Sequence, residues 1–308
     1  MSPPAAPGGE SRLALAAGAS CYLIWGFIPL AFQAIGHLGV GPWEILAHRI
    51  VWSVPVAALF VWIAGQGPQA LAVARQPRTL AWLFLSSLLI ATNWVVFIWA
   101  VTSGRLLETS LGYYINPLVS MAAGALLFRE RIGRIGMAAI GLALGGVAIQ
   151  ALALGHLPWV SLVLAFSFGG YGVVRKQVAA DAQTGFLIET LLVGVAAAGY
   201  MAWLAGQGAS HFSQPAAAAW LVACGPMTSV PLVLFAWAAR RMSLSMMGFL
   251  QFLAPTISFM IGLAQGESFT PLRAVSFALI WGGAGVFVYG AWRRARQVRM
   301  ALVQTAAG

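Results

Sequence analysis

Two stretches of the chain share a pattern of residues at a constant spacing. Residues 97–117 have the sequence FIWAVTSGRLLETSLGYYINP, and residues 235–255 have the sequence FAWAARRMSLSMMGFLQFLAP. An offset of 138 relates Phe97 to Phe235, Trp99 to Trp237, Ala100 to Ala238, Leu106 to Leu244, Pro117 to Pro255 and, further along, Gly124 to Gly262. Apolar chains align easily by chance, but one offset that preserves tryptophan, proline and glycine together favours an internal repeat.

On both sides of these stretches the chain is a succession of long apolar segments. Its residues are 60% hydrophobic and 8% charged, whereas about a quarter are charged in a soluble domain. A bilayer core requires about 20 apolar residues per helix. Ten such segments can be placed: Leu13–Ile35, Trp43–Ile63, Leu80–Val101, Leu106–Phe128, Ile135–Leu154, Trp159–Val174, Phe186–Leu204, Trp220–Ala239, Leu244–Ala264 and Ala274–Trp292. The sequence predicts an all-α membrane protein of ten transmembrane helices.

The basic residues predict the orientation of these helices. If the N-terminus is cytoplasmic, 14 of the 17 Lys and Arg residues fall in loops on the cytoplasmic side. Such an excess in short loops is typical of cytoplasmic loops. We therefore expect both termini in the cytoplasm of a multi-pass protein of the cell (plasma or inner) membrane. Because the arginines lie at segment ends instead of forming one basic face, nucleic-acid binding is not expected.

The repeat predicts two halves of opposite orientation. We divide the chain into a disordered leader (1–12), a first five-helix repeat (13–154), a second five-helix repeat (155–292) and a basic tail (293–308). An odd number of helices inverts the second repeat relative to the first. A separate offset of 145 relates Glu44, near the outer end of its helix, to Glu189, near the inner end of its own. Inverted repeats are typical of secondary transporters, in which the halves exchange conformations.

Five motifs support a family assignment. They are EILAHR at 44–49, NWVVFIWA at 93–100, SLGYYINPLV at 110–119, AQTGFLIET at 182–190 and GFLQFLAP at 248–255. These motifs resemble the RarD-type permeases of the EamA branch of the drug/metabolite transporter superfamily, and the likeness extends from about residue 13 to residue 292. The resemblance implies two inverted five-helix repeats in which four helices of each surround a central cavity. The family is described as chloramphenicol-sensitivity permeases, which does not assign a substrate.

Charged residues collect near the predicted outer end of the first repeat. Glu44 and His48 are four residues apart and share a helix face, and Arg49 follows. Glu108 opens the fourth segment at the same level, directly after Arg105. A structural ion-pair network, an outer gate or substrate-charge site, and proton coupling through His48 and Glu44 are all compatible with this pattern.

Glu189 is the corresponding charge near the predicted inner end of the second repeat. Arg175, Lys176 and Asp181 precede it in the adjoining turn. The pattern is compatible with an inner gate and with a plain interfacial ion pair.

Polar and aromatic residues deep in the segments are candidates for a cavity lining. They are Asn93, Trp94, Tyr113, Tyr114, Asn116 and Gln251. Lining of a cavity for a neutral or zwitterionic amphiphile and hydrogen bonding between helices both explain them. Pro117 and Pro255, which the repeat relates, are candidates for helix bends that open the cavity.

Small residues on two segments predict close helix packing. Gly141 and Gly145 form a Gly-x-x-x-Gly pair on the fifth segment, and Ala278 and Gly282 form its analogue on the tenth. The same pattern is also compatible with a homodimer through these residues.

The main alternative to a transporter is an integral membrane enzyme that acts on lipid-linked substrates. It would need a compact His, Asp, Glu or Cys cluster, whereas the four histidines (37, 48, 156 and 211) lie in separate segments. No Walker nucleotide-binding loop occurs in the sequence. We therefore expect no enzyme, cofactor or metal, but a permease whose partners are the lipid bilayer, a small solute and, as a candidate coupling ion, the proton.

Overall fold

The computed structural model describes residues 7–128, 133–154, 157–239, 250–267 and 269–307, and within these ranges it contains helices and no β-strand. The elements are α1 (Pro7–His37), α2 (Pro42–Ile63), α3 (Gly67–Ala74), α4 (Pro77–Thr102), α5 (Leu106–Phe128), α6 (Arg134–Leu154), α7 (Trp159–Gln177), α8 (Ala182–Gly206), the 3-10 turn η1 (His211–Ser213), α9 (Pro215–Ala239), α11 (Leu253–Ala264) and α12 (Pro271–Ala307). The all-α class is confirmed.

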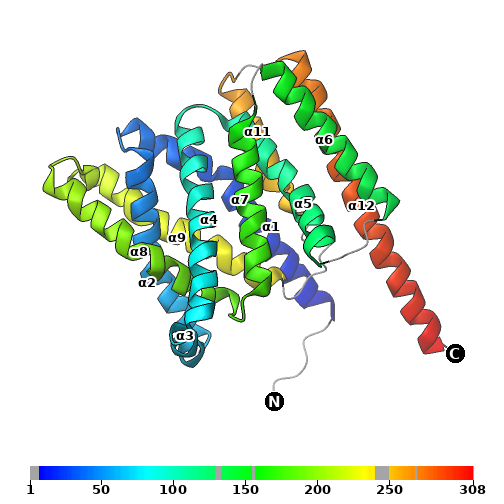
Figure 1. The fold of residues 1–308 in the computed structure, drawn as a ribbon, viewed down its shortest axis with the longest axis horizontal. Helices are drawn as coiled ribbons and strands as arrows, with labels where there is room; N and C mark the ends of the chain where they lie inside the picture. The colour runs from blue at the N-terminus through cyan, green and yellow to red at the C-terminus, as the bar shows by residue number, and fades with distance from the viewer. Residues whose placement is uncertain (1–6, 129–132, 155–156, 240–249, 268, 308) are drawn as a thin grey trace.

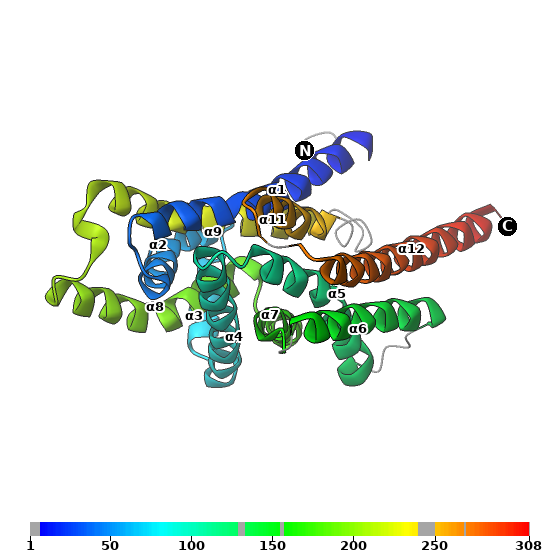
Figure 2. The ribbon, with the colours of Figure 1, turned by 90° about the horizontal axis from the view of Figure 1, so that it is seen from above.

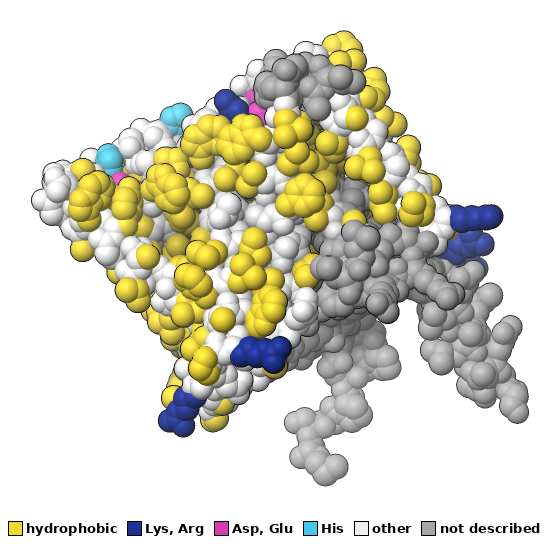
Figure 3. Space-filling view, in the orientation of Figure 1, with side chains coloured by type: hydrophobic (Ala, Val, Ile, Leu, Met, Phe, Trp, Pro, Cys, Tyr) yellow, Lys and Arg dark blue, Asp and Glu magenta, His cyan; other side chains and the backbone are white. Residues whose placement is uncertain are grey.

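Six of these helices are long and apolar enough to cross a membrane. They are the spans Leu13–His37, Pro42–Ile63, Pro77–Thr102, Ala182–Gly206, Pro215–Phe235 and Pro271–Gly290. Large apolar side chains such as Trp62 and Val195 lie on the surface. Figure 3 shows hydrophobic side chains spread over much of one such face, with Lys and Arg near its edges. A surface of this kind is in contact with lipid, so the protein is an integral membrane protein.

Prolines and glycines set the helix boundaries. Prolines occupy the first turns of α2, α3 and α4, where a missing N–H costs no helical hydrogen bond. Gly104 follows α4 with φ +69° and Gly266 follows α11 with φ +81°, conformations that side chains with a Cβ disfavour. These turns bring the chain back into the next helix within a few residues.

Several boundaries differ from the sequence-based expectation. The helix α1 begins at Pro7 and so includes residues 7–12 of the predicted disordered leader, and α12 continues to Ala307 through the basic tail. The short helix α3 was not predicted. Within the described part of 244–264, the helix is interrupted at Phe252, because Pro255 has no N–H for the carbonyl of Gln251, four residues earlier.

The helices α6 and α12 form a pair at one side of the molecule, as Figures 1 and 2 show. Ser276 Oγ donates to the carbonyl of Gly146 at 2.7 Å, and a Cβ built on Gly146 would lie 2.8 Å from the carbonyl oxygen of Ser276. A Cβ on Gly283 would lie 2.9 Å from the carbonyl oxygen of Ala139. Of the predicted small residues, Gly141 and Gly282 face open space and Gly145 meets only the side chain of Leu279 at 3.9 Å, so the close approach of the two helices uses Gly146 and Gly283 instead.

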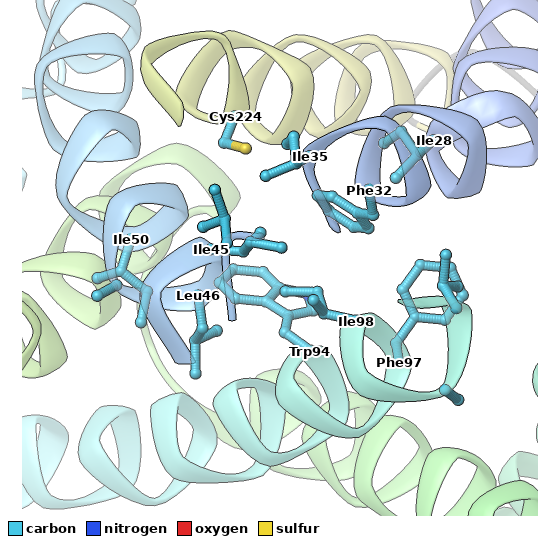
Figure 4. Close-up of a cluster of buried hydrophobic side chains, with 14 of the residues drawn as sticks. Ile28, Phe32, Ile35, Ile45, Leu46, Ile50, Trp94, Phe97, Ile98 and Cys224 are labelled. Atoms are coloured by element: carbon cyan, nitrogen blue, oxygen red, sulfur yellow. The ribbon is translucent and has the colours of Figure 1, made fainter. Parts of the chain in front are cut away.

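The largest apolar core lies among α1, α2, α4 and α9. Figure 4 shows Phe32 of α1, Ile45 of α2, Trp94 of α4 and Cys224 of α9 facing a common interior. Two members of this core, Phe32 and Trp94, contact the buried side chain of Arg49.

Candidate substrate-binding site

Glu44, in the first turn of α2, binds the segment between α8 and α9. Its side chain is 3% exposed. Oε1 accepts hydrogen bonds from the backbone N–H of His211 at 2.8 Å and from Ser210 Oγ at 3.1 Å, and Oε2 lies 2.8 Å from His211 Nδ1. We call Glu44, Ser210 and His211 the Glu44 cluster. The sequence did not reveal His211 as a partner, because it lies 167 residues away in a polar loop.

His48 lies beside this cluster but has its own contacts. Trp52 Nε1 donates to His48 Nδ1 at 3.2 Å, and the His48 ring stacks on Phe212 with 4.9 Å between centroids. Glu44 and His48 thus contact the same short segment, as their shared helix face predicts.

The opposite end of α2 is bound to the start of α8. Gln66 Nε2 donates to Gln183 Oε1 at 2.7 Å, and Thr184 Oγ1 donates to Gln66 Oε1 at 3.0 Å. Asp181 Oδ2 lies 3.4 Å from the same Gln66 nitrogen. We call Gln66, Asp181, Gln183 and Thr184 the Gln66 cluster. Since the Glu44 cluster joins the start of α2 to the end of α8, the two helices run antiparallel.

Glu189 joins α8 to α4 and α7 near the same end. It accepts a short hydrogen bond from Ser86 Oγ and a longer one, of 3.4 Å, from Tyr171 OH. Arg175 lies 3.6 Å away, so the structure brings together the pair that the sequence placed in adjoining segments. The side chain of Lys176 lies outside the described residues.

The charged residues predicted at the outer end of the first repeat have separate partners. Glu108 pairs with Arg105 at 3.6 Å, and Arg105 also covers the ring of Trp99 at 4.9 Å. Glu44 binds His211 instead of either arginine. The expected gathering of two acids, two arginines and a histidine therefore resolves into distinct contacts, because the loop after α8 supplies the partner of Glu44.

Arg49 is a buried cation inside the apolar core. It is 5% exposed, and its Cζ lies 4.3 Å from the ring centroid of Trp94 and 5.4 Å from that of Phe32. Its Nε is buried without a hydrogen-bond partner. Among the described residues, no carboxylate lies within 4.0 Å of it. Cation–π contacts stabilise such a group only in part.

A hydrogen-bonded polar group adjoins Arg49. Asn93 Nδ2 donates to the carbonyl of Leu164 at 2.9 Å and to Ser167 Oγ at 3.1 Å, and Tyr113 OH donates to Asn93 Oδ1 at 3.0 Å. These contacts join α4, α5 and α7. The structure thus brings three of the predicted lining residues, Asn93, Trp94 and Tyr113, close to Arg49.

Other predicted lining residues lie elsewhere. Tyr114 OH lies 2.5 Å from Thr256 Oγ1, and its ring packs on those of Phe252 and Phe277, away from Tyr113. Asn116 is buried, and its Oδ1 has no hydrogen-bond partner. Gln251 is half-buried in the described part of the chain.

The two predicted bends differ in what the structure describes. Pro117 lies within the continuous helix α5, and its side chain lies outside the described residues. Pro255 lies in the first turn of α11, directly after the interruption at Phe252.

Glu267 is an interhelical contact that no predicted site included. Its carboxylate accepts from the backbone N–H groups of Leu106 at 2.5 Å and Leu107 at 3.0 Å, at the start of α5. Burial raises the pKa of Glu267, which these N–H donors lower in turn. A carboxylate at a helix N-terminus binds otherwise unpaired donors and interacts favourably with the helix dipole. The repeat relates Glu267 to Glu130, which lies outside the described residues.

A groove of about 390 Å³ lies between α2 and α8, lined by apolar residues that include Val51, Pro55, Leu191 and Val195. Its lining carries no charged group, and the indole N–H of its Trp52 already donates to His48, so Arg49 and its neighbours are the better candidate site for a polar solute. The described residues contain no group of three or more His, Cys, Asp or Glu that could hold a metal.

These features define the class of protein: an integral membrane protein built from long helices, with polar side chains buried between them and a buried cation, Arg49, for which the described residues provide no anion. Residues 12–152 match the model of the EamA-like transporter family. The chain belongs to this family and is a membrane transporter of the RarD type.

Relatives support the assignment over nearly the whole chain. Protein RarD of Escherichia coli (strain K12) is 40% identical, with 92% of this chain and 96% of the relative covered. The uncharacterized transporter YojE of Bacillus subtilis (strain 168) is 38% identical, with coverage of 93% and 97%. A crystal structure 20% identical in sequence matches with a TM-score of 0.59 over 91% of this chain and 98% of that one, which supports the fold.

Proposed function

We propose that this protein is a secondary transporter that moves a small solute across the cell membrane by alternating access. Two inverted five-helix halves, residues 13–154 and 155–292, would form the transport path, with both termini in the cytoplasm. The observation that carries the proposal is the antiparallel contact between helices that the repeat relates.

Three such helix pairs support the inversion. The clusters at both ends of α2 fix α8 antiparallel to it. Glu267, after the end of α11, binds the start of α5. In the pair of α6 and α12, Gly146 meets Ser276 and Ala139 meets Gly283. A two-fold axis in the membrane plane places related helices in opposite directions, whereas an axis along the membrane normal leaves them parallel.

The packing of the remaining helices has the same symmetry. The helix α1 packs on α9 and α11, and its counterpart α7 packs on α4 and α5. Because the repeat relates α4 to α9 and α5 to α11, exchanging the two halves turns the neighbours of α1 into the neighbours of α7. Each half therefore supplies an equivalent environment to the first helix of the other half.

Contacts between the halves occur at both proposed membrane faces. The Glu44 cluster, Glu267 and a reciprocal pair of amide hydrogen bonds between Gln33 and Gln265, both 2.8 Å, lie at the proposed outer face. The Gln66 cluster and the bond from Ser86 to Glu189 lie at the proposed inner face. Opening one set while the other stays closed would expose the Asn93 and Arg49 region to one side at a time.

Thiol labelling from each side tests this proposal without a known substrate. Ser167→Cys, in a background with Cys21→Ala and Cys224→Ala, places one thiol beside Asn93. We expect a membrane-impermeant thiol reagent to label it from either side of oriented vesicles. If the reagent labelled this thiol from one side of the membrane only, the result would contradict alternating access.

Short bifunctional thiol reagents can lock each face. Linking Gln33→Cys to Gln265→Cys is expected to abolish labelling from outside only, and linking Gln66→Cys to Gln183→Cys to abolish it from inside only. The matched control links Gln76→Cys to Thr79→Cys, which lie in the same half and whose wild-type side chains are 2.9 Å apart. That link is expected to change neither the labelling rate from outside nor the labelling rate from inside.

A membrane enzyme has less support. The described residues hold no group of three or more His, Cys, Asp or Glu that could bind a metal. In the Glu44 cluster, which brings a serine, a histidine and an acid together, Ser210 Oγ and His211 Nδ1 both contact the carboxylate of Glu44, whereas a nucleophilic serine would need a hydrogen bond to the histidine.

A further inference from the structure

Arg49 carries a charge that the described part of the protein does not neutralise. A cation placed in an apolar interior is unfavourable unless an anion or several hydrogen-bond acceptors accompany it. Here the faces of the guanidinium contact aromatic rings, and Nε is buried without a partner. The titratable side chains near enough to interact with it electrostatically are Tyr113 of α5 and Cys224 of α9, which are ordinarily neutral.

The acids of the chain are engaged elsewhere. The seven acidic residues are Glu10, Glu44, Glu108, Glu130, Asp181, Glu189 and Glu267. Five of them have described contacts with other groups: Glu44 with His211, Glu108 with Arg105, Asp181 with Gln66, Glu189 with Arg175, and Glu267 with the start of α5. The side chains of Glu10 and Glu130 lie outside the described residues. No described acid is thus available to neutralise Arg49.

The position of Arg49 connects the two halves of the protein. Phe32, Trp94 and Tyr113 come from α1, α4 and α5 of the first half, and Cys224 comes from α9 of the second. Tyr113 also binds Asn93, which binds α7 of the second half. A ligand that neutralised Arg49 would therefore lie close to side chains of both halves, as a transported solute must.

We propose that Arg49 binds the anionic group of the solute, and that the solute is an organic anion with an apolar or aromatic body. This inference rests on the proposed transport function. The planar guanidinium can donate two parallel hydrogen bonds to a carboxylate or a similar oxyanion. The rings of Trp94 and Phe32 and the surrounding aliphatic side chains suit the apolar body, and Asn93 and Tyr113 supply polar contacts. An anion differs from the neutral or zwitterionic amphiphile that the sequence alone suggested.

Matched pairs of acids and amides test the charge preference directly. The purified full-length protein in nanodiscs of neutral phosphatidylcholine, which contain no lipid anion, is heated with benzoate or benzamide, and with indole-3-acetate or indole-3-acetamide. We expect the melting temperature to rise with the carboxylate of each pair and not with its amide. Adding an anionic lipid to the disc shows whether a lipid headgroup competes for the same site.

Variants of Arg49 assign this preference to one side chain. We expect Arg49→Gln to abolish the preference for the carboxylate over the amide. In Arg49→Lys the half-saturating concentration of the carboxylate should rise at least tenfold, because lysine retains the charge but not the planar guanidinium. Arg78→Gln, which removes an exposed arginine at the start of α4, is the control and is expected to behave as wild type.

Two outcomes would overturn the inference: equal responses to acid and amide in the wild type, or an unchanged preference in Arg49→Gln.

The labelling of Ser167→Cys separates this failure from failure of the transport proposal. Labelling that alternates between the faces without any anion preference would remove the anion site and leave alternating access in place. If Arg49→Gln does not fold, the second readout is the modification of wild-type Arg49 by phenylglyoxal. We expect benzoate to slow this modification and benzamide to leave it unchanged. Equal protection by both compounds would refute the site.

Discussion

Removing Glu44 should open the proposed outer face. Glu44→Ala deletes a buried acceptor of hydrogen bonds from the backbone N–H of His211, Ser210 Oγ and, when its Nδ1 is protonated, the His211 ring. A hydrogen bond to a charged group contributes about 1.5–3 kcal/mol, and the freed donors partly regain water because their segment is near the surface. We therefore estimate a net loss of about 3 kcal/mol of contact between the halves at this face.

That loss converts into a labelling rate. At about 1.4 kcal/mol per tenfold change, the outward-open population should rise on the order of 100-fold while it remains the minor state. The assay is the rate at which an impermeant thiol reagent modifies Ser167→Cys from outside, relative to the rate from inside. Glu44→Gln keeps one carbonyl oxygen as acceptor and should produce a smaller increase, of about tenfold.

Glu108→Gln is the matched control for Glu44. It also removes a carboxylate near the proposed outer face, but its partner Arg105 belongs to the same half, so the ratio of labelling rates should not change. An unchanged outside rate in Glu44→Ala would refute the assignment of Glu44 to a contact that holds the halves together. A rise in the inside rate instead would refute the assigned face.

Three further substitutions have defined outcomes. Gln66→Ala, at the other end of α2, should raise the inside labelling rate and lower the outside rate, as measured with the same reagent. Gly146→Ala places a methyl group 2.8 Å from the carbonyl oxygen of Ser276 and should lower the free energy of unfolding by about 1–3 kcal/mol, as measured by thermal unfolding. The control Gly141→Ala faces open space and should change the free energy of unfolding by less than about 0.5 kcal/mol. Equal effects of the two substitutions would contradict the packing of α6 on α12. Glu267→Ala leaves two N–H groups of α5 unpaired and should cost about 1–2 kcal/mol, and Glu267→Gln should cost less; an unchanged melting temperature in both would exclude this cap.

The sequence predicted the helices well because lipid imposes a simple requirement on them. Length and apolar composition placed a segment at each long helix. The interruption of the helix at Phe252 could be anticipated from Pro255. The presence of α3 could not, since this helix is only eight residues long and has no apolar run of transmembrane length.

The site was harder to predict than the helices. Burial of Glu44, Arg49, Asn93 and Glu189 follows from their positions inside apolar segments, because polar groups at that depth face other protein groups. Their partners do not follow, because contacts between halves depend on helix rotation and tilt. His211 and Glu267 illustrate this difficulty: both lie in polar loops and carry no local pattern that indicates a buried partner.

The register of helix packing also required the structure. The Gly-x-x-x-Gly pattern pointed to Gly141 and Gly145, yet the close approach occurs one residue further on, at Gly146 and Gly283. A shift of one residue rotates the contact by about 100° around an α-helix, and α6 is rich in small residues on several faces. Composition therefore predicts that such a helix packs closely without predicting which face does so.

Spin-label distances across the two faces test alternating access between the halves most directly. Nitroxides at Gln33→Cys and Gln265→Cys report on the proposed outer face, and nitroxides at Gln66→Cys and Gln183→Cys report on the inner face. Pulsed double electron–electron resonance should show a short and a long distance at each face, and Glu44→Ala should increase the long outer population and the short inner population together. Distances that lengthen at both faces in the same variant, or a single unchanged distance at each, would contradict an exchange between outward-open and inward-open states.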